Sequence, residues 1–190
     1  MIQLLKGDCL ELMKLIPDGS IDAIITDPPY GTTACKWDSV IDFNLMWEQL
    51  NRIIKPNGAI VLFGSEPFSS ALRMSNIKNY KYDWVWEKVR PTGFANAKKR
   101  PLKLIENIIV FNCHYNIYKP QGLQKINKKV TNSKSTGGDT TGKFNYGASY
   151  IQEFTNYPKE IIKQGLDEKK KQHPTQKPVE LMEYLIKTYT

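Results

Sequence analysis

The stretch IDAIITDPPYG, residues 21–31, decides how this 190-residue chain is expected to fold. Residues 21–25 are rich in isoleucine, and such a run is typical of a strand that is covered on both faces of an α/β sheet. The two prolines end the strand, because proline lacks an amide hydrogen, fixes its own φ and restricts the residue before it. An acid, two proline carbonyls and an aromatic ring are therefore displayed at the carboxyl end of a strand, where open α/β sheets bind ligands.

Apolar runs and turn-forming residues on both sides of this stretch predict alternating strands and helices. Strands are expected at residues 2–6, 21–26, 59–63, 82–87 and 107–112. Helices are expected at residues 10–16, 43–54, 67–75 and 179–187, with a basic loop at 88–106 and a strong helix stop at 55–58. The order strand, helix, strand, helix, strand implies parallel strands that are joined by right-handed crossovers.

The patterning divides the chain into three parts. Residues 1–112 form the expected α/β core, and residues 172–190 form a proline-rich turn and a helix that return to it. Between them, residues 113–171 lose the apolar periodicity, most clearly in the polar and glycine-rich stretch NSKSTGGDTTGKFNYG at 132–147. Such a segment is either a mobile loop or an insertion that becomes ordered on a partner.

The composition is that of an ordinary globular domain, with 41% hydrophobic and 24% charged residues. The first residues are interrupted by charged side chains, so no secretory or membrane-spanning segment is expected and a cytoplasmic protein is predicted. Three cysteines, Cys9, Cys35 and Cys113, form no CxxC pair. An odd number of unpaired thiols indicates a reducing compartment and no zinc site.

The net charge of +8 is concentrated in one part of the chain. Residues 88–134 hold eleven Lys or Arg against one acid, which gives this segment +10 and, by subtraction from +8, leaves about −2 for the rest. A basic block on a nearly neutral body is expected of a protein that binds a polyanion. A merely solvated lysine-rich face explains the charge equally well.

Five sequence blocks, in this order, resemble the amino-methylating DNA methyltransferases of the permuted β group. They are GDCLELMKLIPDGSIDAIITDPPYG at 7–31, IIKPNGAIVLFGSEPF at 53–68, YDWVWEK at 82–88, GFANAKKRPLKLIENIIVF at 93–111 and HPTQKPVELMEYLI at 173–186. The resemblance implies an α/β fold with the Rossmann-like sheet of S-adenosylmethionine-dependent methyltransferases and an irregular target-recognition insertion at 113–171. It also implies double-stranded DNA as the partner, S-adenosylmethionine as the cofactor and a prokaryotic or phage-encoded enzyme.

In that family the chemistry depends on the DPPY turn. An exocyclic amine is a poor nucleophile inside a base stack, so the base has to be flipped out and held in a pocket. The resemblance gives Asp27 and the carbonyl of Pro28 the role of accepting hydrogen bonds from the amine, with Pro29 completing the turn and Tyr30 stacking on the base. An acid at the head of the motif favours N6 of adenine, and N4 of cytosine is the alternative. Without the resemblance, residues 27–30 are equally typical of a structural turn between a strand and a loop, in which the Asp caps a neighbouring amide.

The resemblance also assigns cofactor and DNA contacts. Residues expected near S-adenosylmethionine are Asp8, Cys9, Asp27, Thr175 and Lys177, with Lys177 facing the carboxylate of the cofactor. Asp8 alternatively caps the first helix, and the HPTQKP sequence alternatively forms a bare turn before the last one. Residues expected to contact DNA phosphates are Asn96, Lys98, Lys99, Arg100, Lys128 and Lys129. The resemblance implies no metal.

The chain departs from the family pattern at one place. No FxGxG-like turn, which contacts the methionine part of the cofactor in the family, follows the last helix or stands elsewhere in the sequence. The missing strands would lie between the expected strands at 2–6 and 21–26. Three explanations remain open: a piece of a longer enzyme, a natural truncation that keeps only DNA affinity, or a second polypeptide that supplies the missing segment. A homodimer is also compatible with the sequence.

Overall fold

The computed structural model describes residues 2–35, 37–112, 117–131, 149–165, 173 and 175–190. These residues form two compact units, one from residues 1–119 and 159–190 and the other from residues 120–158. Each unit is described by itself. The polar stretch at 132–147 and Cys113 lie outside the described residues.

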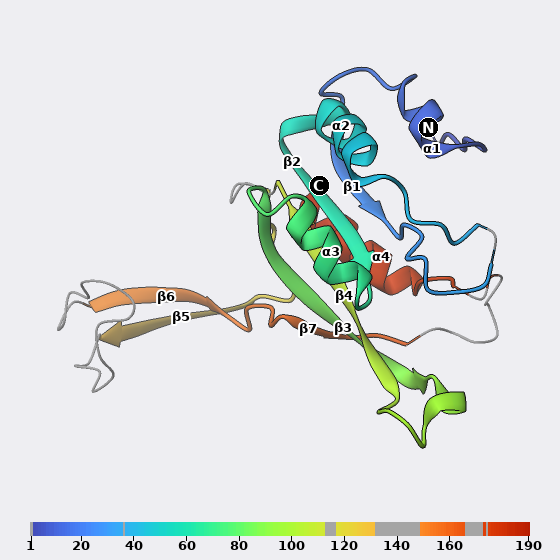
Figure 1. Ribbon diagram of the computed structural model, residues 1–190. Helices are drawn as coiled ribbons and strands as arrows, with labels where there is room; N and C mark the ends of the chain where they lie inside the picture. The colour runs from blue at the N-terminus through green and yellow to red at the C-terminus, as the bar shows by residue number, and fades with distance from the viewer. Residues whose placement is uncertain (1, 36, 113–116, 132–148, 166–172, 174) are drawn as a thin grey trace. The chain divides into compact units, whose positions relative to one another are not determined.

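The first unit is built on a five-stranded mixed sheet of order β1-β2-β4-β3-β7 (Figure 1). Its strands are β1 (Ile21–Thr26), β2 (Ile54–Gly64), β3 (Tyr80–Thr92), β4 (Lys103–Phe111) and β7 (Ile161–Lys163). β1 and β2 are parallel, as are β3 and β7, whereas β4 runs antiparallel to both β2 and β3. The α/β class is therefore confirmed, and so is the parallel pairing expected of the strands at 21–26 and 59–63. The antiparallel direction of β4 was not predicted. The reason is local: β3 and β4 are consecutive strands of one hairpin, and a hairpin enforces antiparallel pairing.

Helices cover both faces of the sheet, and the alternation of side chains along β2 decides which face each helix covers. Ala59, Val61 and Phe63 pack with α4 (Val179–Tyr189) on one face. Ile60 and Leu62 point the other way and pack with α2 (Phe43–Ile53) and α3 (Phe68–Ser75). All five of these β2 side chains are fully buried, so the strand is central to both cores.

The boundaries of most elements agree with the sequence. The helices expected at 43–54, 67–75 and 179–187 are confirmed to within two residues at each end. The helix does stop before residues 55–58, but these residues belong to β2 rather than to a separate turn. They interrupt the register between β1 and β2, since Ile21 pairs with Ile54 whereas Ala23 pairs with Ala59. The basic loop at 88–106 is shorter than expected, since β3 and β4 extend into it and the turn between them holds a short 3-10 helix, η1 (Phe94–Asn96).

The amino-terminal expectation is wrong. Residues 2–6 form no strand, and Ile2 and Leu4 are about nine-tenths exposed, at 89% and 92%. Residues 2–6 pair with no strand of the described sheet, and a lone strand is not stable in water. The helix that follows, α1 (Cys9–Met13), is five residues long and has no buried residue.

The second unit is an antiparallel hairpin of β5 (Gln124–Thr131) and β6 (Ser149–Thr155). Together with β7, these strands lie in the segment 113–171 that was expected to be irregular. Because β7 pairs with β3 in the first unit, the second unit, residues 120–158, covers fewer residues than the predicted insertion at 113–171. The role of the insertion in target recognition stays a prediction.

Candidate active site

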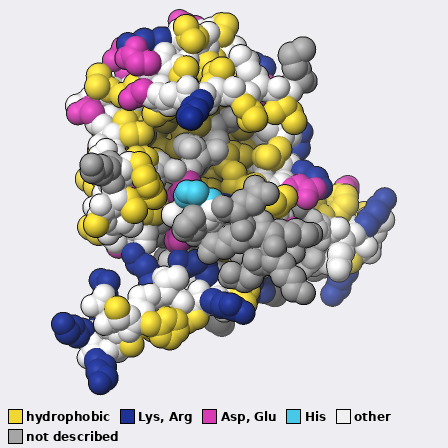
Figure 2. All heavy atoms as spheres, turned by 90° about the vertical axis from the view of Figure 1, so that its right-hand side faces the viewer, with side chains coloured by type: hydrophobic (Ala, Val, Ile, Leu, Met, Phe, Trp, Pro, Cys, Tyr) yellow, Lys and Arg dark blue, Asp and Glu magenta, His cyan; other side chains and the backbone are white. Residues whose placement is uncertain are grey.

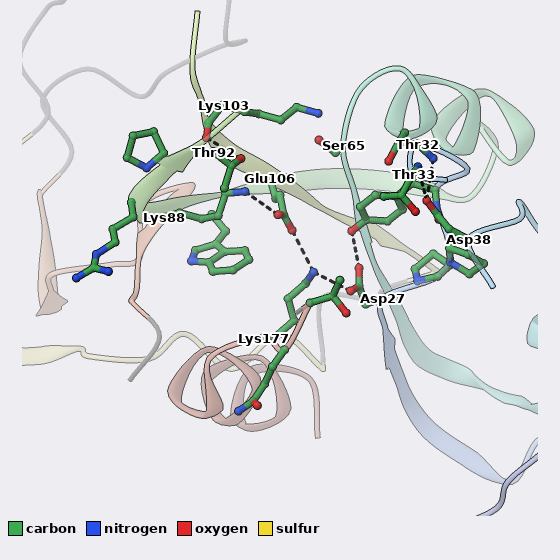
Figure 3. Close-up of a pocket in the computed structure, with 18 of the residues that line it drawn as sticks. Asp27, Thr32, Thr33, Asp38, Ser65, Lys88, Thr92, Lys103, Glu106 and Lys177 are labelled. Carbon is green, nitrogen blue, oxygen red and sulfur yellow. Dashed lines mark hydrogen bonds and ion pairs between the residues drawn. The ribbon is translucent and has the colours of Figure 1, made fainter. Parts of the chain in front are cut away.

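The candidate site lies at the carboxyl end of β1, where Asp27 directly follows the last residue of the strand. A cavity of about 740 Å³ opens at this position in the first unit. Its walls are the DPPY turn, the turn at 175–177 before α4, and the base of the β3–β4 hairpin (Figure 3). Segments that are about 150 residues apart in the sequence therefore meet at one point, as the Lys177–Asp27 contact shows.

The loop after the two prolines is held by a single buried carboxylate. Asp38, which is 8% exposed, accepts hydrogen bonds through Oδ1 from the amides of Tyr30 and Gly31, at 2.8 and 2.9 Å. Its Oδ2 accepts from the amides of Thr32 and Thr33, at 2.9 and 2.7 Å. Burial alone would raise the pKa of Asp38, but hydrogen bonds from Thr33 and from the backbone amides outweigh it and lower the pKa to about 2. The loop is thus fixed by four charge-assisted hydrogen bonds.

Tyr30 is fixed at both ends of its side chain. Its ring stacks on Phe68 of α3, with centroids 5.1 Å apart and planes at 26°. Its hydroxyl donates a hydrogen bond to Asp27 Oδ1 at 2.5 Å. Burial, followed by the charge of Asp27, raises the pKa of Tyr30 far above its ordinary value, so the phenol stays a donor. Since Tyr30 also lines the cavity, its ring is held ready for a ligand.

Four alternating charges cross the floor of the cavity. Lys177 Nζ donates to Asp27 Oδ2 at 2.7 Å and lies 3.1 Å from Glu106 Oε2. Lys88 Nζ donates to Glu106 Oε1 at 2.8 Å. Except for Asp27, at 28%, these side chains are at most 16% exposed. The row contains two lysines and two acids, so its formal charges cancel, which limits the cost of burying them.

The neighbours of Glu106 keep it ionised. Burial opposes ionisation, but Lys177 and then Lys88 outweigh it and lower the pKa of Glu106 below its ordinary value. Glu106 Oε2 is buried and accepts no hydrogen bond within the described residues, because Lys177 reaches it only as an ion pair. Glu106 therefore stays charged beside the cavity.

Lys177 occupies an aromatic and acidic environment. Its ammonium lies 5.1 Å from the ring centroid of Phe63 and 5.8 Å from that of Trp86. The sequence predicts that this lysine faces the carboxylate of a cofactor, whereas in the structure it contacts two carboxylates of the protein itself. An ammonium has three donors, so Lys177 can serve a further acceptor in the cavity.

The predicted residues fall into four places. Those that line the cavity are Asp27, Pro28, Pro29, Tyr30, Thr175 and Lys177. Asp8 and Cys9 lie at α1 instead, where the carboxylate of Asp8 accepts from the amide of Leu10 at 2.8 Å and so caps the helix. The predicted DNA contacts are exposed or half-buried at the tip of the β3–β4 hairpin (Asn96, Lys98, Lys99 and Arg100) and exposed on β5 of the second unit (Lys128 and Lys129).

Five charged residues of the cavity were missed from the sequence: Asp38, Lys88, Arg90, Lys103 and Glu106. Asp38 stands in an irregular loop, and Lys88 looks like one more cation of the basic segment. A usable signal existed for Glu106, because it is the one acid among eleven cations between residues 88 and 134 and stands in a strand. An acid in that position is expected to have a partner.

Three further features of the described residues bear on function. No cluster of three or more His, Cys, Asp or Glu side chains that could hold a metal ion occurs in the part of the chain that the structure describes. Over the same residues, no helix has the length and apolar character needed to cross a membrane. Cys9 and Cys35 are exposed free thiols.

The chain matches the N6_N4_Mtase family, described as DNA methylase, over residues 21–190. It therefore belongs to the family of DNA methylases that act on exocyclic amines. The match includes the strand that carries Asp27, the cavity and the turn that carries Lys177.

Comparison with individual proteins agrees with this membership. The chain is 29% identical over 220 residues to the type II methyltransferase M.HinfI of Haemophilus influenzae, and the match covers 96% of this chain and 54% of M.HinfI. It thus spans about half the length of that relative.

Two solved structures share the fold. The structure of the M1.HpyAVI complex with SAM superimposes with a TM-score of 0.55 at 23% identity, covering 100% of this chain and 78% of that one. The PvuII methyltransferase, which is cytosine-N4-specific, superimposes with a TM-score of 0.60 at 15% identity, covering 97% and 68%. At these identities the likeness concerns the fold.

Proposed function

We propose that the protein transfers a methyl group from S-adenosylmethionine to the exocyclic N6 amine of adenine in double-stranded DNA. The observation that carries the proposal is the position of Asp27-Pro28-Pro29-Tyr30 at the carboxyl end of β1, on the wall of a cavity of about 740 Å³. M.HinfI is a type II methyltransferase, which supports a role in DNA modification.

The cavity suits the cofactor in size and in the polar groups that it offers. Ligand sites generally have volumes of roughly 300–1,000 Å³, and this cavity falls within that range. Thr175 and Lys177 offer a hydroxyl and an ammonium to polar groups of the ligand. When bound, S-adenosylmethionine supplies an electrophilic methyl group on its sulfonium sulfur.

The residues of the DPPY turn would orient the amine. The carboxylate of Asp27 has about four acceptor positions, of which Tyr30 and Lys177 use two, so it can also accept from an exocyclic amine. The carbonyl of Pro28 would accept the second amine hydrogen and aim the lone pair. Phe68 covers one face of the Tyr30 ring, which leaves the other for stacking on the flipped base. Positioning is the main catalytic device in this reaction.

The preference for adenine over cytosine rests on the acid at position 27, since a serine there is the commoner pattern of the cytosine N4 enzymes that this chain resembles. N4 of cytosine is the alternative target. Transfer of a labelled methyl group to unmethylated DNA, followed by mass spectrometry of the digested nucleosides, tests both at once. Detection of N6-methyladenine supports the proposal. Detection of N4-methylcytosine would show that cytosine is the target base, while the reaction would still be methyl transfer to an exocyclic amine.

A second candidate is DNA binding without methyl transfer. It is favoured by the ion pair between Lys177 and Asp27, which directs toward the protein a side chain that is expected to serve the cofactor. The same assay distinguishes the two functions. A chain that binds DNA with strong salt dependence, yet neither binds S-adenosylmethionine nor yields a methylated nucleoside, has only the binding function.

A further inference from the structure

The β3–β4 hairpin beyond Glu87 has a base and a tip with different surroundings, and we call residues 88–103 the arm. At its base, Lys88, Arg90 and Lys103 line the cavity. The pairing of the two strands is irregular there, because Glu87 pairs with Ile105 but the next pair is Thr92 with Lys103. The extra residues of β3 form part of the cavity wall, so the arm begins at the candidate site itself (Figure 3).

The tip of the arm is stiffened by its own backbone. Gly93 has a φ of 92°, a left-handed conformation that strains other residues, and it starts the turn. The amide of Asn96 donates to the carbonyl of Gly93 at 2.9 Å, and the carbonyl of Asn96 accepts from the amides of Lys99 and Arg100 at 2.8 and 3.0 Å. A side chain that such a turn presents loses little backbone freedom when it binds.

Phe94 stands on this tip with 67% of its surface exposed. It makes no ring contact with any other aromatic residue that the structure describes. Around it the arm holds six cations and no acid. Lys88 pairs with Glu106, whereas Arg90, Lys98, Lys99, Arg100 and Lys103 form no ion pair within the described ranges. Figure 2 shows dark blue side chains gathered on this arm.

An exposed aromatic ring among unpaired cations has a specific use on DNA. The cations bind phosphates on both sides of a groove, and the ring can then enter the base stack between them. Apolar wedges of this kind unstack a base step, and unstacking is what extrusion of a target base requires. The phosphates alone would need no phenylalanine, so the ring adds a function that the charge does not explain.

We infer that Phe94 is a wedge that enters the DNA stack beside the target base and promotes its extrusion toward the cavity. This inference rests on the proposed function, since it assumes that a base has to reach Asp27. The arm then performs two tasks on one element: its cations hold the phosphates, and its tip opens the stack next to the cavity wall that its base forms.

The test compares four versions of the full chain: wild type, Phe94→Ala, Phe94→Trp and Met74→Ala. Met74 is the matched control because it is a 69% exposed apolar side chain on α3 that does not line the cavity. Each protein is mixed at saturating concentration with a pool of random-sequence duplex DNA, and the reactivity of thymines toward permanganate, which attacks unstacked thymine, is read by sequencing. DNA affinity and methyl transfer are measured on the same pool.

We expect wild type, Phe94→Trp and Met74→Ala to increase permanganate reactivity within one recurring sequence. Phe94→Ala should reduce that increase about tenfold, because one stacking contact is lost, while its DNA affinity stays within about threefold of wild type. Methyl transfer by Phe94→Ala should recover on duplexes in which the target base is mismatched, since a mismatched base costs less to extrude.

The inference is overturned if Phe94→Ala unstacks DNA as well as wild type does, or if wild type unstacks none. If wild type methylates DNA and Phe94→Ala is as active on paired as on mismatched targets, the inference is rejected and the proposed function stands. If the wild-type protein unstacks DNA through Phe94 but forms no methylated nucleoside, the proposed function is rejected and the wedge role of Phe94 stands.

Discussion

Replacement of Asp38 by Asn should loosen the loop that holds the candidate site, and its cost can be worked out from the structure. The pKa of Asp38 is lowered from 3.8 to about 2. Because a pKa difference of one between the unfolded and the folded state is worth about 1.4 kcal/mol, ionised Asp38 stabilises the fold by about 2 kcal/mol. In Asp38→Asn one oxygen still accepts two amides, but the new amide group faces the two other donors, of Thr32 and Thr33. We expect the free energy of unfolding to fall by about 3 kcal/mol at pH 7, measured by urea denaturation.

The pH dependence gives the prediction a second signature. Because the pKa of the folded state is the lower one, the stabilisation is fully present above pH 4 and is lost as the pH falls from about 4 through about 2. Asp38→Asn should lack this component. The control is Asp42→Asn: Asp42 caps α2 by accepting from the amides of Asn44 and Leu45 at an exposed position, and because Asn caps a helix about as well as Asp does, this change should cost well under about 1 kcal/mol. Equal costs for the two variants, or an unchanged acid limb in Asp38→Asn, would refute the reasoning.

Three further outcomes are expected. Asp27→Ala should abolish methyl transfer and leave DNA affinity nearly intact; activity above one hundredth of wild type would contradict its role. Replacing Lys98, Lys99 and Arg100 together by Ala should lower the slope of log affinity against log salt by about 2.7, since each phosphate contact contributes about 0.9, and an unchanged slope would move the phosphate contacts elsewhere. Glu106→Gln removes the acid between two lysines that are at most 16% exposed, so we expect a loss of about 2 kcal/mol in urea denaturation; a stability equal to that of wild type would mean that its ion pairs contribute nothing.

The elements that the sequence predicts well are those in which local pattern and burial agree. β1 and the buried half of β2 appear as isoleucine-rich or continuously apolar runs, and both are in the sheet. The last helix is predicted because its apolar positions recur with helical spacing, and Leu181 and Leu185 are indeed buried. The resemblance to a known family brings Asp27 and Lys177 together, although nothing in their local sequence relates two residues 150 positions apart.

The features that the sequence analysis missed or got wrong are those that depend on contacts with distant parts of the chain. Apolar alternation says that a strand exists but not which strand lies beside it, so the antiparallel β4 was not foreseen. Residues 2–6 have a strand-like composition, yet the structure gives them no neighbour. Asp38 was missed for a similar reason, since its four donors are backbone amides, which every sequence contains. The ion pairs of Glu106 are invisible until β3, β4 and the turn before α4 are assembled.

The site and the core form one mechanical unit, because the position of Lys177 depends on the packing of the helix that follows it. α4 begins at Val179, directly after Pro178, and is held on the sheet by Leu181, Leu185 and Tyr189, which are at most 1% exposed. At the far end of the helix, the hydroxyl of Tyr189 accepts a hydrogen bond from Trp84 Nε1 at 2.6 Å. β3 therefore anchors α4 through Trp84 and contributes Lys88 to the charged row through the same strand. A shift of α4 along the sheet would move Lys177 relative to both Asp27 and Glu106, so the geometry of the cavity floor is set by apolar contacts that contain none of its charges.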